Sequence, residues 1–363
     1  MADILQGGRL KLSSKDFVAS GVPAYGAGGV NGRVDVVEFT GPSVVLSSIG
    51  ARCGKCFYVD GDWTSLANTQ VIRPDLSRVD PKFLWYQLND ELSWHRSGTG
   101  QPFIKPSDVR ARSVQLPDLS EQRRIAAILD HADALRAKRR EALACLDELT
   151  QSIFVDMFGD FATNSKGWPI VSVADLCDVK GGKRLPKGSD YVSEPTPYRY
   201  LRVTDMKGGS VDPGTLNFIS EDVQQKIARY VVQAGDVAIS IAGSIGIVAV
   251  ITDELDGVNL TENAAKLVPR AAGRYRPEFL AAALRTRPCQ GQIASQTGQV
   301  TIGKLALFRI EKIELPLPPI DLQDSFVDRL AELGKLRQWH QSSLAELAAL
   351  FASLQSRAFR GEL

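Results

Sequence analysis

The sequence predicts an α+β fold in which two similar mixed α/β domains are separated by two long helices that form an antiparallel coiled coil, as a pseudo-two-fold internal repeat. Two observations predict this fold. Short motifs of the first half recur in the same order in the second half, about 200 residues further along the 363-residue chain. Each half also ends in a long segment almost free of Gly and Pro, at residues 121–158 and 322–359. A chain of this length has room for two or three domains.

Five short motifs carry the repeat. The matching pairs are residues 7–9 with 181–183, 48–50 with 244–246, 68–74 with 263–269, 97–104 with 295–302, and 116–122 with 317–323. The separation grows slowly along the chain, as loop insertions in a duplicated domain would make it. No single match is strong, but five in one order indicate a duplication.

Each half opens with a globular stretch rich in Val, Ile, Tyr, Thr and Gly and interrupted by turn residues, which is typical of short strands and helices. We place the first domain at residues 1–117 and the second at residues 160–318. Residues 237–251 form the longest apolar stretch, but Gly243 and Gly246 interrupt it. This stretch therefore predicts two strands around a glycine turn rather than a membrane span.

The long helices are predicted at residues 118–159 and 319–363. A Pro-containing strap precedes each helix, and Asp118 and Ser120 lie where an N-cap is expected. Apolar residues alternate along both helices in steps of three and four, which is typical of helices that pack along their length. The predicted helix–helix seam consists of Leu129, Ala132, Leu143, Leu146, Ile153, Leu330, Leu333, Leu344, Leu347 and Leu354. A single long surface helix on a globular domain is the alternative, but the duplication gives each seam a matching seam to pack against.

The length of these helices suggests a spacer. A helix of this length spans roughly 50 Å, which is on the order of one helical turn of DNA or somewhat more. Two similar halves with short joints tend to pack with approximate two-fold symmetry. The helices would then run antiparallel, and one globular domain would lie at each end at a fixed spacing.

The overall charge neither supports nor excludes nucleic-acid binding. The formal net charge is +1, from 43 Lys and Arg against 42 Asp and Glu, and opposite charges can gather on different faces. Five scattered cysteines do not make a disulfide framework. No signal sequence follows Met1, so we expect a cytoplasmic protein with no membrane partner.

No motif predicts catalysis. Residues 298–304 have the spacing of a phosphate-binding P-loop, but Leu305 stands where the magnesium-binding hydroxyl is needed. Cys53 and Cys56 have the spacing of half a zinc site or a redox pair, and no second ligand pair accompanies them. The three histidines lie apart, and the Pro-Pro of residues 318–319 is followed by Ile rather than by the aromatic residue of an adenine methyltransferase loop. We therefore expect no catalytic residue, no metal and no cofactor in this chain.

Several motifs resemble the specificity subunits of type I restriction–modification systems. LPDLSEQRRIAAIL at residues 116–129 is similar to the start of the conserved helical region of that family, and LTQSIFVDMFG at 149–159 is similar to its end. Residues 353–363 resemble the end of the second such region. WPIVSVADL at 168–176 resembles the opening of a target-recognition domain, and PAYGAGGVNG at 23–32 resembles a glycine-rich loop of many such domains. The resemblance covers nearly the whole chain.

The resemblance implies a non-catalytic adaptor of a DNA methyltransferase and endonuclease complex. Each target-recognition domain would read one half of a bipartite site in double-stranded DNA. The helices would set the spacing between the halves and dock two methyltransferase (modification) subunits, which two restriction subunits join. S-adenosylmethionine, ATP and magnesium would belong to these partner subunits. The alternatives are a self-contained NTPase, and a stand-alone helical scaffold or DNA-binding regulator without restriction–modification partners.

The first domain departs from the family pattern at its start. The second domain opens with Trp168, well ahead of its Gly-Gly pair at Gly181, whereas Gly7 is only six positions after Met1. The first domain is therefore predicted to lack an opening strand. Either a neighbouring segment completes its sheet, or the first domain is less fully functional than the second.

Basic and amide side chains on the loops of both domains are the candidates for DNA contact. Arg and Lys pair with guanine, and Asn and Gln with adenine, in the major groove, while hydroxyls and backbone N–H groups hold phosphates. The candidates of the first domain are Lys11, Tyr25, Asn31, Arg33, Arg52, Lys55, Gln101 and Lys105. Those of the second domain are Arg184, Lys187, Arg199, Arg202, Thr204, Lys207, Asn263, Gln299 and Lys304. For any single member, a solvated surface charge is the alternative.

Overall fold

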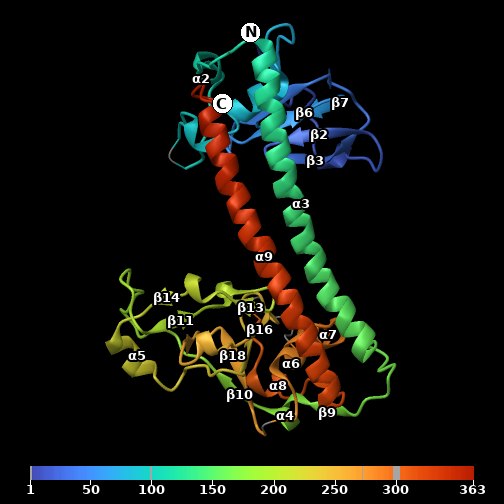
Figure 1. Cartoon of the computed structure of the whole chain (residues 1–363), viewed down its shortest axis with the longest axis vertical. Helices are drawn as coiled ribbons and strands as arrows, with labels where there is room; N and C mark the ends of the chain where they lie inside the picture. The colour runs from blue at the N-terminus through green and yellow to red at the C-terminus, as the bar shows by residue number, and fades with distance from the viewer. Residues whose placement is uncertain (1, 99, 272, 297–302) are drawn as a thin grey trace. The chain divides into compact units, whose positions relative to one another are not determined.

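The computed structural model describes residues 2–98, 100–271, 273–296 and 303–363 (Figure 1). The chain divides into two compact units. Unit 1 comprises Met1–Glu141 and Gln341–Leu363, and unit 2 comprises Ala142–His340. Each unit therefore contains one sheet-based domain and one segment of each long helix.

Unit 1 is built on two four-stranded sheets. The antiparallel sheet with the order β1-β8-β5-β6 consists of β1 (Ala2–Gln6), β8 (Thr69–Pro74), β5 (Ser43–Ser47) and β6 (Cys56–Val59). The sheet with the order β3-β2-β7-β4 consists of β3 (Gly29–Val34), β2 (Val22–Gly26), β7 (Asp62–Ser65) and β4 (Phe39–Thr40), and β2 and β7 run parallel. Helix α1 (Pro81–Leu88) contacts β5 and β6, and α2 (Pro106–Ala111) contacts β1. These helices bury Leu84 and Val109 against the strand residues Leu46 and Ile72.

Unit 2 has the same main sheet and several additional elements. The main sheet has the order β10-β18-β15-β16 and consists of β10 (Cys177–Gly181), β18 (Ala264–Pro269), β15 (Val237–Ser240) and β16 (Val248–Val250). The smaller sheets are formed by β14 (Asn217–Phe218), β11 (Arg199–Leu201) and β17 (Asn259–Leu260), by β12 (Met206–Lys207) and β13 (Ser210–Val211), and by β19 (Glu314–Pro316) and β9 (Ile170–Ser172). The helices are α4 (Val173–Leu176), α5 (Glu221–Ile227), α6 (Pro277–Leu284), α7 (Arg287–Gln296) and α8 (Leu307–Ile310). Strands β15 and β16 pair antiparallel. This pairing confirms the two strands that were predicted within residues 237–251.

The strand order confirms the predicted duplication. In unit 1, β1, β8, β5 and β6 take the places that β10, β18, β15 and β16 take in unit 2. Pro74 lies opposite Ala2 in one sheet, and Pro269 lies opposite Cys177 in the other. The predicted match between the two Asn-to-Pro motifs is therefore correct.

Three other predicted matches are shifted in register. The backbone N–H of Gly7 donates to the carbonyl of Thr69 at 3.0 Å. In unit 2, Gly182 rather than Gly181 donates its N–H to the equivalent carbonyl, that of Ala264, also at 3.0 Å. The predicted match of Gly7 with Gly181 was therefore wrong by one residue. By sequence, Gly7 can be aligned with either Gly181 or Gly182, but only Gly182 makes the equivalent backbone hydrogen bond.

The second shift follows β5 and β15. The N–H of Ser48 donates to the carbonyl of Asn68 at 2.9 Å, and the N–H of Ile241 donates to that of Asn263 at 2.8 Å. Ser48 therefore corresponds to Ile241 and not to Ser244, the predicted match. The predicted match relied on two similar Ser-Ile-Gly triplets. The backbone pairing that fixes the true correspondence cannot be read from the sequence.

The third shift concerns the end of the next motif. The N–H of Ile104 donates to the carbonyl of Ser48 at 2.9 Å, and the N–H of Leu305 donates to that of Ile241 at 2.9 Å. Ile104 thus corresponds to Leu305 rather than to Ile302, the predicted match. Residues 297–302, which held most of that motif, lie outside the described residues.

The two long helices are α3 (Leu119–Phe158), with 40 residues, and α9 (Ile320–Ala358), with 39 residues. The carboxylate of Asp118 caps the start of α3, because its Oδ1 accepts a hydrogen bond from the N–H of Glu121 at 2.9 Å. Ser120 lies within the helix and donates its hydroxyl to the same oxygen at 2.5 Å. Asp118 is therefore the N-cap, and Ser120 is not.

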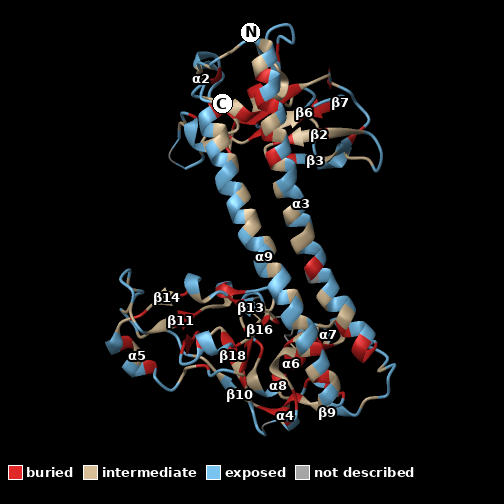
Figure 2. Ribbon diagram, viewed as in Figure 1, coloured by how far each residue is buried: buried red, intermediate tan, exposed pale blue. Residues whose placement is uncertain are grey.

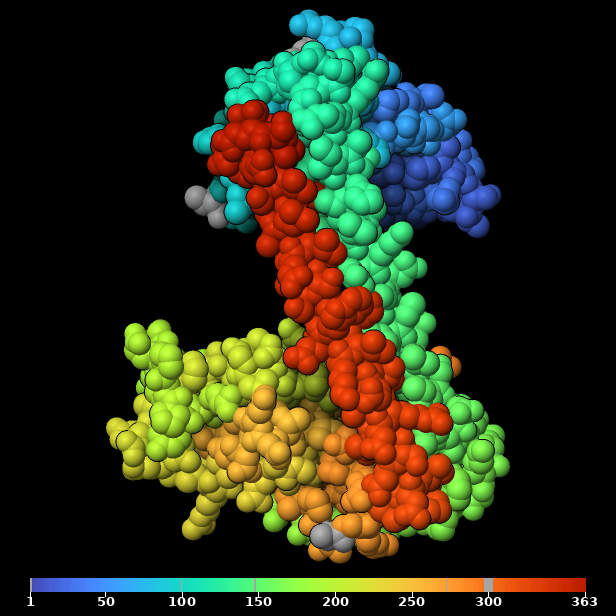
Figure 3. All heavy atoms as spheres, in the orientation of Figure 1, coloured from blue at the N-terminus to red at the C-terminus, as the bar shows by residue number. Residues whose placement is uncertain are grey.

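Opposite ends of the two helices meet inside each unit. In unit 1, Ile125 and Leu129 of α3 form one apolar cluster with Leu354 and Ala358 of α9, and Figure 3 shows these two helix segments side by side. In unit 2, Phe158 of α3 packs edge to face against Phe326 of α9 with ring centroids 5.2 Å apart, inside the largest apolar cluster of that unit. Each globular domain is thus anchored on both helices.

The ten predicted seam residues are all buried or half-buried (Figure 2). Leu129 and Ala132 are buried, and Leu330 and Leu333 are half-buried between exposed neighbours. A helix that buries one stripe of apolar side chains produces this pattern. The pairing of both helices along their whole length stays a prediction.

Candidate nucleic-acid interface

Four of the predicted DNA-contact residues line one hollow of unit 2. The hollow has a volume of about 390 Å³. Its lining contains Arg184, Arg202, Thr204 and Asn263, together with Leu185, Tyr191, Tyr200, Val203, Thr261 and Glu262. These residues come from the segment after β10, from β11 and the turn behind it, and from the turn between β17 and β18.

A close backbone approach brings Arg184 to this hollow. A Cβ atom on Gly182 would lie 2.1 Å from the carbonyl oxygen of Thr261, so only glycine fits at that position. The next residue, Lys183, donates its N–H to the carbonyl of Leu260 at 2.8 Å. The chain leaving β10 is thereby held against the β17–β18 turn, and Arg184 follows directly.

The guanidinium of Arg184 is held by Glu262. Its Nε donates to Oε1 of Glu262 at 2.6 Å, while 78% of the arginine side chain stays exposed. Burial acts to raise the pKa of Glu262, but hydrogen bonds from Arg184, from its own backbone and from Thr261 outweigh burial and lower that pKa. Glu262 is therefore ionised near neutral pH and orients Arg184 without covering it.

Arg202 has a similar carboxylate support. Its Nε and Nη2 donate to the two carboxylate oxygens of Asp205 at 3.0 and 2.7 Å, a bidentate pair that fixes the guanidinium plane. These hydrogen bonds raise the pKa of Arg202. The guanidinium carbon also lies 5.7 Å from the ring centroid of Tyr191.

Two tyrosines that the sequence did not single out complete the hollow. The rings of Tyr191 and Tyr200 lie 5.9 Å apart, and the hydroxyl of Tyr200 donates to the carbonyl of Lys183 at 2.7 Å. Burial raises the pKa of Tyr200 to about 12. Tyr200 and Arg202 are two residues apart on an extended segment and share a face, so the period of two was the signal that could have found Tyr200.

The chemistry of this hollow suits binding. Arg184 and Arg202 supply planar, permanently charged donors, and Asn263 supplies an amide with both donor and acceptor. Thr204 is exposed and offers a hydroxyl. This is the set of groups that pairs with base edges and phosphate oxygens.

The other candidates of unit 2 lie outside this hollow. The guanidinium of Arg199 donates to the carbonyls of Glu254 and Pro213 at 2.6 and 3.4 Å, so it holds two loops together. The remaining three described candidates, Lys187, Lys207 and Lys304, are exposed but do not line the hollow. Gln299 lies outside the described residues.

Two charged groups of this hollow have no counterpart among the described residues of unit 1. Backbone pairing makes Gly26 the counterpart of Arg202, and Ala67 the counterpart of Glu262. Neither residue carries a charged side chain. Unit 1 therefore lacks the equivalents of the Arg202 guanidinium and of the Glu262 carboxylate, whereas Arg9 takes the position of Arg184.

Unit 1 has a larger groove of about 1080 Å³ that contains two of its candidates, Tyr25 and Lys55. The groove lies between the domain and the long helices of the same unit, and Arg136 and Arg140 of α3 also line it. Lys82 forms an ion pair with Asp130, whose other oxygen accepts from the hydroxyl of Tyr86 at 2.9 Å. The remaining lining consists of Gly28, Gly29, Val30, Cys56, Phe57, Tyr58, Trp85, Asn89, Asp133, Ala134, Ala137, Phe351 and Gln355.

Two further candidates of unit 1 support the glycine-rich loop. Nη1 of Arg52 donates to the carbonyl of Gly28 at 3.3 Å, and the side chain of Asn31 lies over Gly26. Arg33 donates to the carbonyl of Gly21 at 2.6 Å. The last three candidates, Lys11, Gln101 and Lys105, are exposed and do not line the groove.

The two closely spaced cysteines are buried thiols. Sγ of Cys53 donates to the carbonyl of Ser48 and Sγ of Cys56 to that of Leu88, both at 3.4 Å. Burial raises the pKa of both thiols. Among the described residues, no group of three or more His, Cys, Asp and Glu side chains is arranged to hold a metal ion. In that same part of the chain, no helix combines the length and apolarity that crossing a membrane requires.

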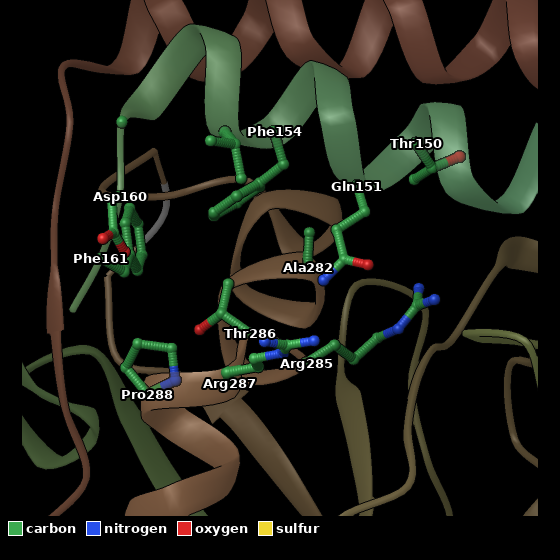
Figure 4. Close-up of a pocket in the computed structure, with 12 residues that line it drawn as sticks. Thr150, Gln151, Phe154, Asp160, Phe161, Ala282, Arg285, Thr286, Arg287 and Pro288 are labelled. Atoms are coloured by element: carbon green, nitrogen blue, oxygen red, sulfur yellow. The ribbon is translucent and has the colours of Figure 1, made fainter.

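A third hollow, of about 220 Å³, lies beside the end of α3 in unit 2 (Figure 4). Phe154 and Phe161 form its apolar wall, and Gln151, Thr286 and Arg287 supply polar groups. Its lining includes none of the predicted DNA-contact residues. We therefore do not assign it to the interface.

The family comparison matches most of the chain. A family model described as the type I restriction modification DNA specificity domain matches residues 1–144 and 165–349. The EcoBI type I restriction enzyme specificity subunit of Escherichia coli is 24% identical over 352 residues, which cover 84% of this chain and 72% of that protein. The MjaVIII specificity subunit of Methanocaldococcus jannaschii is 23% identical over 317 residues, which cover 81% of this chain and 72% of that protein.

Two solved structures share the fold. The type I restriction–modification S subunit of M. genitalium superposes with a TM-score of 0.57 at 20% identity, over 99% of this chain and 93% of that one. A chain from a study of assembly and conformational transition in the type I R-M system has a TM-score of 0.53 at 21% identity, over 88% and 82% of the two chains.

Proposed function

This chain belongs to the type I restriction–modification DNA specificity family, and we propose that it is the subunit that selects the DNA sequence in such a complex. Each globular domain reads one half of a bipartite site in double-stranded DNA. The two relatives described above are themselves named specificity subunits, which supports this role over that of a helical scaffold without partners.

The observation that carries the proposal is the hollow around Arg184 and Arg202. Both guanidiniums are oriented from behind by a carboxylate, Glu262 and Asp205, and both leave donors toward solvent. An oriented arginine that reaches into the major groove donates two parallel hydrogen bonds to O6 and N7 of guanine. Because the side chain is ordered before DNA arrives, little rotamer freedom is lost on binding.

The two long helices act as the spacer. The start of α3 packs with the end of α9 in unit 1, and the end of α3 packs with the start of α9 in unit 2. An antiparallel coiled coil continuous through the predicted seam accounts for both sets of contacts. Helices of 40 and 39 residues would reach roughly 60 Å, which exceeds one turn of DNA.

The chemistry belongs to partner subunits. The hollow of unit 2 holds binding groups without a nucleophile and an adjacent base, so we propose that the chain is non-catalytic. Two modification subunits and two restriction subunits bring S-adenosylmethionine, ATP and magnesium. We propose residues 1–117 and 160–318 as the two target-recognition domains, with the helical segments 118–159 and 319–363 as spacer and docking surface.

A domain exchange tests this function. Residues 160–318 are replaced by the equivalent segment of a relative with a known DNA site, and the complex is expressed with its modification subunit. The expected result is a methylated site in which one half has changed and the other half is retained. An unchanged site in a folded, assembled complex contradicts the proposal, and so does the absence of any complex with a modification subunit.

A further inference from the structure

The two units differ in how one sheet edge is covered. In unit 2, β9 pairs antiparallel with β19, so that Val171 lies opposite Leu315. The chain then turns into α4, where the N–H of Val173 donates to the carbonyl of Ile313 at 2.9 Å. The side chains of Val173 and Leu176 are fully buried in the core of unit 2.

No described residue forms such a segment along the corresponding edge of unit 1. Two anchors fix the correspondence, because Ile104 matches Leu305, and Gln122 makes the same kind of contacts as Gln323. With that offset, residues 113–115 take the place of β19. Among the described residues, nothing forms a strand along residues 113–115.

An apolar hollow of about 210 Å³ lies where Val173 and Leu176 would pack. Its lining includes Ile4, Ile72, Leu84, Leu88, Val109 and Val114. Their counterparts in unit 2 are Val179, Leu267, Leu280, Leu284, Ile310 and Leu315, which all belong to or pack against the core cluster that contains Val173 and Leu176. Unit 1 thus keeps the receiving surface, and none of its described residues fills it.

A second hollow, of about 500 Å³, continues along the same edge. Phe83, Leu116 and Phe359 contribute to its lining. The counterpart of Phe83 is Phe279, and in unit 2 the ring of Phe161 lies 6.4 Å from it. The two hollows together therefore trace the path that residues 161–176 follow in unit 2.

We propose that this edge of unit 1 binds an extended segment of a partner polypeptide. The segment pairs antiparallel with residues 113–115, turns once into a helix, and inserts two apolar side chains three residues apart into the smaller hollow, as Val173 and Leu176 do in unit 2. Arg110 and Arg112 also line that hollow, so the occupant is apolar with an acidic residue near its turn. This site is independent of DNA recognition.

The test uses the intact chain and a labelled synthetic peptide, WPIVSVADL, which copies residues 168–176. Fluorescence anisotropy is expected to show saturable binding of one peptide per chain, and the melting temperature is expected to rise with peptide concentration. The control peptide carries V173D and L176D, and should bind at least about tenfold more weakly because it would bury two charges. Failure of the first peptide to bind, or equal binding of both peptides, overturns the proposal.

A chain variant locates the binding edge. Val114→Pro removes a backbone donor from the accepting segment and should weaken binding at least about tenfold, with circular dichroism verifying that the variant is folded. If the Val114→Pro variant misfolds, the comparison of the WPIVSVADL and V173D/L176D peptides on the unchanged chain decides whether the proposal holds. If the free chain forms a dimer that the WPIVSVADL peptide dissociates, a second copy occupies the site and the assignment to a partner polypeptide is wrong.

Discussion

The side-chain carbonyl of Gln122 lies 2.8 Å from the backbone nitrogen of Asp80 and accepts its hydrogen bond. The amide of the same glutamine donates to the carbonyls of Arg78 and Pro117 at 3.0 and 2.8 Å, and its side chain is buried. One residue of α3 thus joins the strap before the helix to the start of α1. This contact attaches the first domain to its helix.

Unit 2 has the matching contact. The side-chain carbonyl of Gln323 accepts from the N–H of Arg276 at 2.9 Å, and its amide donates to the carbonyl of Pro318 at 2.8 Å. We expect Gln122→Ala and Gln323→Ala each to lower the free energy of unfolding by about 1–3 kcal/mol, because buried partners are left without hydrogen bonds. Urea denaturation followed by circular dichroism measures the change.

Gln338 is the matched control for both glutamines, since it is exposed on α9. Gln338→Ala should leave the free energy of unfolding within about 0.5 kcal/mol of the wild type. If the control lowers stability as much as Gln122→Ala does, the buried amides do not attach the domains.

Arg202→Ala should relax recognition at one half of the DNA site. Removing an arginine that pairs with a guanine costs about 1–3 kcal/mol of discrimination at that base, whereas the half-site read by unit 1 should be unaffected. Methylation by the assembled complex of sites altered one base at a time measures this. Lys226 of α5, exposed and outside the hollow, provides a control in Lys226→Ala, and equal loss at both half-sites would argue against the assignment of the hollow.

Asp236→Ala should strongly destabilise unit 2. The carboxylate of Asp236 is 2% exposed, lies 3.4 Å from Nζ of Lys266, and accepts from the N–H of Gln233 at 2.9 Å. Removing this partner leaves the ammonium of Lys266, whose side chain is 12% exposed, without its counter-charge, which costs about 3–5 kcal/mol. Glu332 forms an exposed pair with Lys335, so Glu332→Ala should cost at most about 1 kcal/mol; similar losses from both changes in thermal unfolding would contradict the account.

The cysteines should differ sharply in reactivity. Cys145 is exposed, whereas Cys53, Cys56, Cys177 and Cys289 are buried. Burial raises the pKa of Cys177 to about 11 and raises those of the other three buried thiols. Since the thiolate is the reactive form, these four should not react at pH 8.

A titration with a disulfide reagent at pH 8 tests this, with one fast thiol expected in the folded chain and five in guanidinium. Cys145→Ser should abolish the fast reaction. Rapid labelling of two or more thiols in the native wild-type chain would mean that a cysteine-bearing core opens readily.

Sequence patterns predicted the duplication and the long helices because these leave periodic marks on the chain. They did not predict the register of three of the five motif matches. A three-letter similarity, such as the one at Ser48, carries less information than backbone pairing does. The motif that contains Gln122 was recognised, but its contact with Asp80 requires a segment 42 residues upstream and is invisible to local reasoning.

The candidate site was predicted in part for the same reason. Residue type and loop position led to Arg184, Arg202 and Asn263, which line the hollow, while their contact with DNA stays a prediction. Alternation along β11 could have separated Arg199, which ties two loops, from Arg202, which faces the hollow. Glu262 could not be found in this way, because its role depends on a tertiary contact with Arg184.

The most direct measurement is a map of methylated bases across the host genome, with and without the gene for this chain. The account predicts that deletion removes one modified motif, made of two specified halves separated by unspecified bases, and that restoring the gene restores it. A methylation pattern that is identical in both strains of a host that expresses this chain with its modification subunit would contradict the account.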